Sequence, residues 1–298
     1  MSYEKEVKNR MSKKFPAELL GGTYRNQSYP HIFKNLDDNF IDGKRQIKKC
    51  LKGNLTDGDI KYNYAEHLNS SQTMCIAYFK KFFEKPEYEP LLAEILMIHK
   101  INLTDSNGFS DAVFEHIPCP KEGTNFDFYL KTMDGKQITW EIKFTESEFK
   151  KIALQGNNSD NYIKKYEDIY IQMLQNCVYY RYPAVTCDSY ECTDANDNTY
   201  ICNVHDKCSV YEFFNHYQIR RNILYARNKG DYVIFLTPRE NKILDDDRAY
   251  IEYYADKWGT DCIKNIFWED LLETTLRVVS PVPVLFDYYK KFKEKYFD

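Results

Sequence analysis

The sequence has no long run of apolar residues. No stretch of its 298 residues approaches the roughly 18 consecutive apolar residues that a membrane-spanning helix needs. The first residues, MSYEKEVKNRMSKK, are strongly charged and lack the apolar segment of a signal peptide. We therefore expect a globular, cytoplasmic protein that has no membrane partner.

The motifs of several common enzyme classes are also missing. The sequence has no Gly-rich phosphate loop of the Walker type, no Gly-x-Ser-x-Gly elbow and no His-Glu-x-x-His motif. It has no internal repeat and no low-complexity tract. The missing phosphate loop leaves no support for ATP or for another nucleotide cofactor.

Cysteines are present, but none forms a Cys-x-x-Cys pair. Nine cysteines are an odd number, and in a large chain without an export signal they favour reduced thiols over a disulfide framework. A Tyr- and Asp-rich loop contains His205 and four of these residues: Cys187, Cys192, Cys202 and Cys208. Their spacing matches no standard zinc site, so free thiols in a partly buried loop are favoured over bound Zn²⁺.

The charge is distributed unevenly along the chain. The net charge of -4 argues against a protein that coats nucleic acid without specificity. Met1 to Lys52, however, contain 12 Lys+Arg against 6 Asp+Glu, which leaves 29 against 39 for the rest of the chain. This basic segment could contact phosphates, although a solvated helical face would have the same composition.

Apolar periodicity and turn signals predict the order of the elements. A partly helical decoration over 1–60 precedes a core over 61–298, which has a Cys-rich insertion near 183–209. The core begins with two predicted helices, one over 63–83 and one in EYEPLLAEILMIHK, where Glu94 shares the apolar face. Alternation then predicts three strands, over 111–117, 125–131 and 137–145. The later elements are expected in this order: helices over 160–181 and 210–227, a buried strand over 231–238, a helix near Tyr250, a strand over 263–267 and an amphipathic C-terminal helix. These elements indicate an α/β fold with a mixed central sheet flanked by helices.

Two of the predicted strands carry acidic residues that could share a metal ion. In ITWEIKFTE, alternation places Glu141 and Lys143 on the face opposite the apolar residues, and TNFDF places Asp127 on the preceding strand. The Asp134-Gly135 turn joins these strands as a hairpin, so the carboxylates could come together. Magnesium binds carboxylate, carbonyl and water oxygens, which the two acids and the Ile142 carbonyl could supply. A nearby lysine could orient or deprotonate a metal-bound water.

The Glu-x-Lys pattern alone has little specificity, because it occurs four times in the sequence. Only the copy at Glu141 and Lys143 lies in an alternating strand that follows a strand aspartate. An exposed strand face with an ordinary ion pair is the alternative interpretation. The 26 tyrosines and 19 phenylalanines could stack on unpaired bases, but at helical spacing most are expected to be core residues.

The order of these elements resembles the PD-(D/E)XK nuclease superfamily, whose core is α-β-β-β-α-β. More narrowly, the segments SSQ, TNFDF, EIKFTE, QIRRN and IFWEDLL, between Ser70 and Leu272, resemble a family of bacterial restriction endonucleases. The resemblance implies a DNA endonuclease in which Asp127 and Glu141 ligate Mg²⁺ or Mn²⁺ and Lys143 is the catalytic lysine. The proline of the superfamily name is absent before Asp127, as it is in many members.

The resemblance also implies roles for residues on the helices. Glu94 is the candidate for an additional helical acid at the metal, and a carboxylate at the solvent rim is its alternative. Gln218 is the candidate for a polar residue near the metal or the scissile phosphate. Gln175, with Tyr179, copies a pattern of exonuclease-like branches and is its rival, and Glu146 is a candidate for support of the site.

Three functions remain open from the sequence. They are a DNA endonuclease, an exonuclease that acts on ends, and a binding module that keeps a nuclease-like fold without catalysis. Cleavage of both DNA strands would suggest a homodimer with one active site for each strand.

Overall fold

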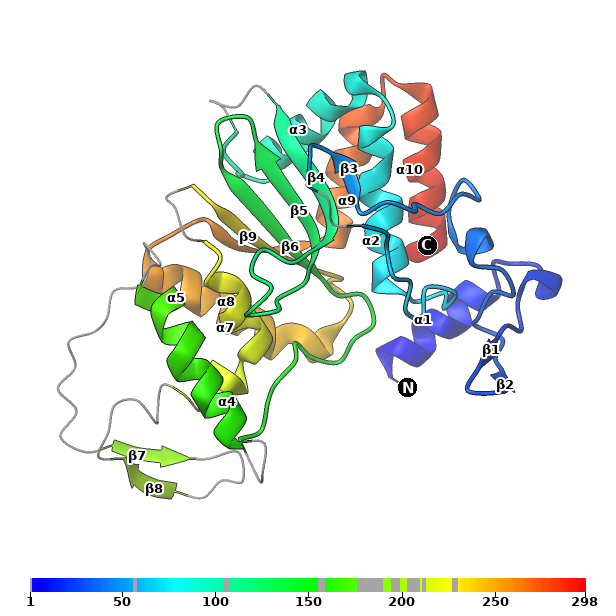
Figure 1. Cartoon of the computed structure of the whole chain (residues 1–298). Coiled ribbons are helices and arrows are strands. Elements are labelled where there is room, and N and C mark those ends of the chain that lie inside the picture. Colours follow the sequence, from blue (N-terminus) through cyan, green and yellow to red (C-terminus); the bar gives the residue numbers. More distant parts are fainter. Residues whose placement is uncertain are drawn as a thin grey trace.

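A six-stranded mixed sheet forms the centre of the protein in a computed structural model (Figure 1). The structure describes residues 2–55, 58–103, 108–154, 159–175, 190–193, 199–202, 210, 213–226 and 230–298. The strand order is β10-β9-β6-β5-β4-β3. The bounds of these strands are β3 (Cys50–Lys52), β4 (Phe109–His116), β5 (Phe126–Thr132), β6 (Gln137–Ile142), β9 (Tyr232–Thr237) and β10 (Ile263–Phe267).

The strands β4, β5 and β6 form an antiparallel meander, whereas β9 and β10 continue the sheet in parallel with β6. The tight turn between β5 and β6 contains Gly135, whose φ of +94° favours glycine. The crossover from β6 to β9 contains α4 (Ser159–Lys165), α5 (Ile171–Gln175) and α7 (Tyr217–Ile223), and α8 (Asp245–Trp258) follows β9. The expected α/β fold with a mixed, helix-flanked sheet is therefore confirmed, with the strand and helix order of a restriction-endonuclease-like core.

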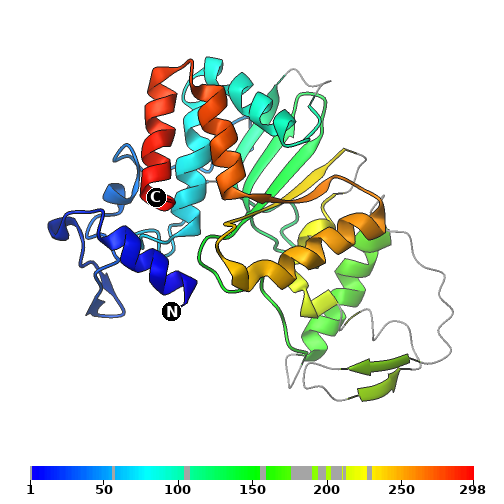
Figure 2. The same ribbon diagram turned by 180° about the vertical axis from the view of Figure 1, so that it is seen from behind.

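Helices cover both faces of the sheet (Figures 1 and 2). Trp140 of β6 and Ile234 of β9 pack with one helical layer, whereas Phe235 of β9 packs with the other. The first layer contains α2 (Ser71–Phe79), α3 (Glu89–Ile98), α9 (Trp268–Val279) and α10 (Pro283–Tyr296). The second side contains α4 (Ser159–Lys165), a π-helical segment (Tyr166–Tyr170), α5 (Ile171–Gln175), α7 (Tyr217–Ile223) and α8 (Asp245–Trp258). Within the described residues, no helix is long and apolar enough to cross a membrane.

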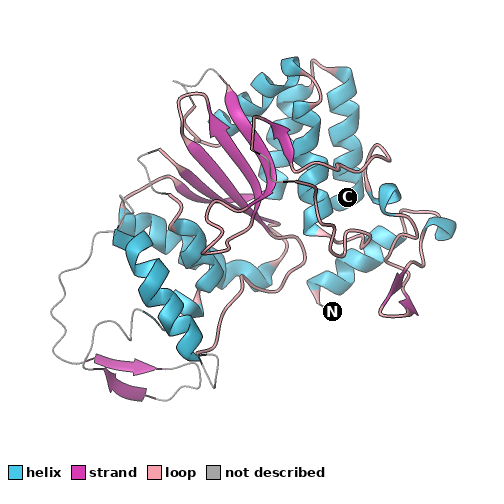
Figure 3. Ribbon diagram, viewed as in Figure 1, coloured by secondary structure: helices cyan, strands magenta, loops and turns pink. Residues whose placement is uncertain are grey.

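The N-terminal segment contributes to the same core as the sheet. Val7 and Met11 of α1 (Tyr3–Ser12) are buried in the larger apolar cluster, and the Lys14 ammonium donates to the Glu294 carbonyl at 2.5 Å. Farther along, β3 pairs antiparallel with β4 and forms one edge of the sheet. The described residues also form shorter elements (Figure 3): the hairpin β1 (Thr23–Tyr24) and β2 (Gln27–Ser28), the hairpin β7 (Tyr190–Thr193) and β8 (Thr199–Cys202), and 3₁₀ turns at Ala17–Leu19, Leu36–Asn39, Lys80–Phe83, Pro86–Tyr88 and Lys242–Leu244.

The predicted strands lie where they were expected, but some helices have different bounds. The helix predicted over 63–83 begins only at Ser71, because the Ser70 hydroxyl accepts the Thr73 N–H at 3.2 Å and caps it. The single C-terminal helix is in fact two, α9 and α10. Pro283 occupies the first turn of α10, where its missing N–H costs nothing.

Candidate active site

The two strand carboxylates lie where the β5–β6 ladder ends. The paired residues run from Lys131 and Gln137 to Phe128 and Trp140, and the next pair in this register would be Asp127 with Glu141. At this point the Asp127 carboxylate accepts the Ile142 N–H at 2.6 Å, so a side chain takes the place of a ladder bond. Because successive pairs alternate between the two faces, the register directs both acids to the same side of the sheet.

The strand β6 remains anchored on its other side. It pairs with β9 as far as Ile142 and Leu236, and the Lys143 N–H donates to the Leu236 carbonyl at 2.9 Å. The indole N–H of Trp268 donates to the Lys143 carbonyl at 3.3 Å. These contacts hold the backbone of Glu141 and Lys143 rigidly, which a catalytic group requires.

Glu141 is buried and accepts three side-chain hydrogen bonds. Lys143 Nζ donates to Oε1 at 3.1 Å, and Gln218 Nε2 donates to the same oxygen at 2.6 Å. Asn222 Nδ2 donates to Oε2 at 2.9 Å. A carboxylate removed from water needs such partners, and these donors fix the orientation of Glu141.

The charges of Asp127, Glu141 and Lys143 interact more strongly than those of an ordinary surface ion pair. Burial raises the pKa of Asp127 well above its ordinary value, and the negative charge of Glu141 raises it further. Burial opposes the charge of Lys143, but the carboxylates of Glu141, Glu146 and Asp127 outweigh it and raise the pKa of the ammonium. The site thus holds negative charge that a cation would stabilise, with a protonated lysine beside it.

Glu146 belongs to the surroundings of this site. Its Oε2 accepts the Phe144 N–H at 2.6 Å, and its Oε1 accepts the Ser71 hydroxyl at 2.6 Å. Asn69 Nδ2 donates to the Thr145 hydroxyl at 2.7 Å. These bonds tie the segment after β6 to the beginning of α2, which keeps Glu146 half-buried instead of in open solvent.

Glu94 does not join the carboxylates. Its side chain is exposed on α3, so the expectation that it lies on the buried apolar face is wrong. The chain that follows α3 reaches the opposite end of the sheet, where the Asn102 N–H donates to the hydroxyl of Tyr232, the first residue of β9. Glu141 lies at the other end of its strand, near the end of the parallel pairing. Glu94 is therefore a carboxylate at the solvent rim, which was the alternative interpretation.

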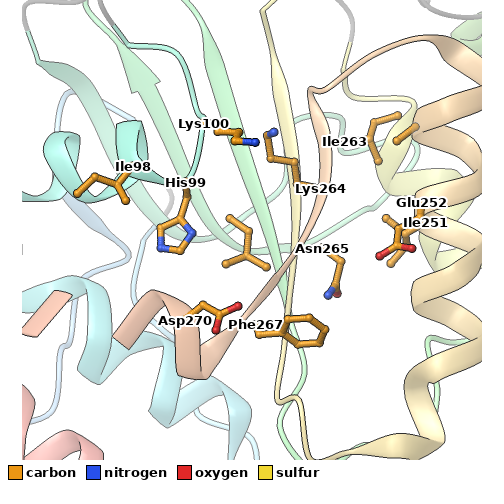
Figure 4. A pocket seen from close by; sticks show the side chains of 12 residues that line it. Ile98, His99, Lys100, Ile251, Glu252, Ile263, Lys264, Asn265, Phe267 and Asp270 are labelled. Atoms are coloured by element: carbon orange, nitrogen blue, oxygen red, sulfur yellow. The ribbon is translucent and has the colours of Figure 1, made fainter. Parts of the chain in front are cut away.

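Figure 4 shows where α3 ends. Ile98 and His99 lie there across from Lys264 and Asn265 of the edge strand β10, around a cavity of about 380 Å³. Neither catalytic carboxylate candidate lines this cavity. We therefore place the candidate site at the end of the β5–β6 ladder and not here.

The helix residue Gln218 lies against the site. Besides donating to Glu141, its Oε1 accepts the Lys150 N–H at 3.0 Å, so its amide is held at both ends. The side chain of its rival Gln175 and the whole of Tyr179 lie outside the described residues. Asn222 was not singled out from the sequence, although QIRRN contains it four residues after Gln218. That spacing places both amides on one helical face and was the signal available.

The chemistry of the residues present fits a divalent ion. Asp127, Glu141 and the Ile142 carbonyl could supply hard oxygen ligands, and the Oδ1 atom of buried Asn222 has no partner among the described residues. Within the described part of the chain, no cluster of three or more His, Cys, Asp or Glu could hold a metal by itself. Water and a substrate phosphate would complete the shell, as magnesium commonly requires.

The zinc question falls mostly outside the described residues. Cys187, His205 and Cys208 are not described, and only the backbones of Cys192 and Cys202 are, on the paired strands β7 and β8. The preference for free thiols over Zn²⁺ at these cysteines stays a prediction.

A comparison with known families identifies the chain. The family described as Restriction Endonuclease associating with ARP matches residues 8–297, nearly the whole sequence. No curated protein and no solved structure gives a significant match. The expected restriction-endonuclease-like relationship is confirmed, and the chain belongs to the family of restriction endonucleases that associate with ARP.

Proposed function

We propose that this protein is a DNA endonuclease of the PD-(D/E)XK type that hydrolyses phosphodiester bonds with the help of Mg²⁺ or Mn²⁺. The arrangement of Asp127, Glu141 and Lys143 at the end of the β5–β6 ladder is the observation that supports this proposal most directly. The family match supports a nuclease-like role for the same chain.

Each residue would have a separate task in this reaction. Asp127 and Glu141, with the Ile142 carbonyl, would hold the ion, which supplies Lewis-acid stabilisation and a more acidic bound water. Lys143 would place its positive charge beside the phosphate as negative charge develops there. Gln218 and Asn222 would keep Glu141 oriented, since both donate to its carboxylate.

Lys143→Ala is the direct test of the mechanism. The wild type should nick closed circular plasmid with Mg²⁺ or Mn²⁺, and the variant should lose about 10²- to 10⁴-fold in rate, the usual contribution of one such group. Lys242→Ala is the matched control, because Lys242 also ends a Glu-x-Lys pattern but has an exposed side chain. Equal nicking by the Lys143 and Lys242 variants would disprove the proposed mechanism.

The same assay separates the alternatives. A closed circle has no ends, so an exonuclease would degrade linear DNA and leave the circle intact. A binding module without catalysis would leave both substrates intact, and calorimetry would then show no uptake of Mg²⁺ that depends on Asp127.

A further inference from the structure

A second cavity lies beside the candidate active site, between the N-terminal segment and the chain that follows β6. Its volume is about 640 Å³, within the usual range for a small-molecule or nucleotide site. Figures 1 and 2 show α1 beside the segment after β6 and the start of α2. Its lining includes Lys8, Tyr24, Tyr64, His67, Glu146 and Glu148.

Part of the cavity lining is aromatic. The ring centroids of Tyr24 and Tyr64 are 5.3 Å apart, and that of His67 lies 5.5 and 5.7 Å from them. Tyr64 is 57% exposed and has a φ of +58°, a left-handed conformation that a bulky residue rarely adopts. Strain of this kind is often found at ligand sites. The backbone thus holds an aromatic ring at the surface, available for stacking.

The lining is also rich in carboxylates, those of Glu4, Glu146 and Glu148. Each Glu146 oxygen already accepts one hydrogen bond, and Glu4 pairs with the Lys8 ammonium at 2.6 Å. The side chain of Glu148 is exposed. This surplus of acceptors disfavours a phosphate and favours a ligand that carries N–H donors. Burial and the charge of Lys8 lower the pKa of His67, which favours the neutral ring.

The cavity and the carboxylates share Glu146. This residue lines the cavity, and its charge acts on both Asp127 and Lys143. It follows Lys143 by three residues, so their α-carbons are at most about 10–11 Å apart. A nucleotide next to a phosphate held at Lys143 could therefore place its base in the cavity.

We propose that this cavity binds an unpaired DNA base bearing an exocyclic amino group, next to the scissile phosphate. The aromatic rings stack on the base, and the lining carboxylates accept the amino hydrogens. A paired base cannot offer its face for such stacking, so the strand must be single or locally opened there. This inference rests on the proposed nuclease function and adds a substrate preference to it.

Binding of labelled 12-nucleotide single strands, measured by fluorescence anisotropy with EDTA to prevent cleavage, tests the proposal. Tyr64→Ala weakens binding about 5- to 100-fold, the effect of losing one stacked base, whereas Tyr64→Phe keeps the ring and binds as the wild type does. Tyr253→Ala is the matched control, since Tyr253 is 54% exposed on α8 and does not line the cavity. Equal binding by the Tyr64→Ala and Tyr253→Ala variants would overturn the proposal.

Base composition tests the amino-group preference. Oligo-dA and oligo-dC bind more tightly than oligo-dT, and equal affinity for all three would overturn this part of the proposal. The plasmid assay gives a separate result for the nuclease function. A protein that binds strands through Tyr64 but cuts nothing refutes the nuclease alone, and one that cuts but ignores Tyr64 refutes the base site alone.

Discussion

Replacing Asp127 by asparagine should make the metal-free protein more stable and inactive at the same time. The wild-type carboxylate is half-buried, and its partial burial and the negative charge of Glu141 raise its pKa. Asparagine has almost the same shape, and its oxygen can still accept the Ile142 N–H that Asp127 accepts at 2.6 Å. The substitution therefore removes the repulsion between the carboxylates at positions 127 and 141 but keeps the hydrogen bond from the Ile142 N–H.

The size of the effect follows from two opposing terms. The bond to Ile142 becomes neutral, which costs about 1 kcal/mol because charged hydrogen bonds are worth about twice as much as neutral ones. Removing a buried carboxylate that faces a like charge gains several kcal/mol at most, since the burial cost of one ion is of that order. We expect a net gain of about 1–2 kcal/mol, or about 2–8 °C in Tm.

The gain should depend on pH, and its sign follows from the raised pKa. A carboxyl whose folded-state pKa lies above its unfolded value stabilises the fold below the unfolded pKa. That contribution is lost as the pH rises through the folded-state pKa of Asp127. The variant has no such titration, so its advantage over the wild type increases with pH across this window.

Thermal unfolding in EDTA across a pH series measures this difference. Asp134→Asn is the control, because Asp134 is exposed in the β5–β6 turn and hydrogen bonding to Thr132 and Lys136 lowers its pKa despite slight burial. This control should bring no gain in Tm. If Asp127→Asn lowers Tm, or changes it by the same amount at every pH, the two carboxylates do not repel each other as described.

Further predictions concern the surrounding residues and the ion. Asn222→Ala should lower the free energy of unfolding in urea by about 2–4 kcal/mol, because it removes a buried hydrogen bond to Glu141 and leaves a cavity. Gln218→Ala should lower it less, because Gln218 is only half-buried. Equal losses would contradict this difference in burial. Glu94→Gln should leave plasmid cleavage unchanged and stability within about 0.5 kcal/mol, and a large loss of cleavage would return this residue to the site. Magnesium at about 100 times its Kd should stabilise the wild type by about 2.7 kcal/mol and leave Asp127→Asn unaffected, and an equal shift in both would place the ion elsewhere.

The strands were predictable because their signal is local. Alternation in ITWEIKFTE and the Asp134-Gly135 turn fix which faces Glu141 and Lys143 occupy, and β6 and β10 begin where periodicity placed them. The hairpin register then brings Asp127 opposite Glu141, so the central pair was within reach of sequence reasoning.

The rest depends on tertiary packing that periodicity does not encode. Glu94 shares a helical face with apolar residues, yet which part of α3 is covered depends on how the helix packs against α9. Asn222 is four residues from Gln218, but only the docking of α7 on the sheet directs it to Glu141. Joining of β3 from the N-terminal segment to the sheet edge likewise required the folded structure.

The most direct measurement is a crystal soaked in Mn²⁺ and recorded at a wavelength where manganese scatters anomalously. One peak bonded to an oxygen of Asp127 and an oxygen of Glu141, with the Lys143 ammonium beside it, is the predicted result. A peak bound to only one of the two carboxylates, or no peak between them at saturating Mn²⁺, would contradict a shared metal site.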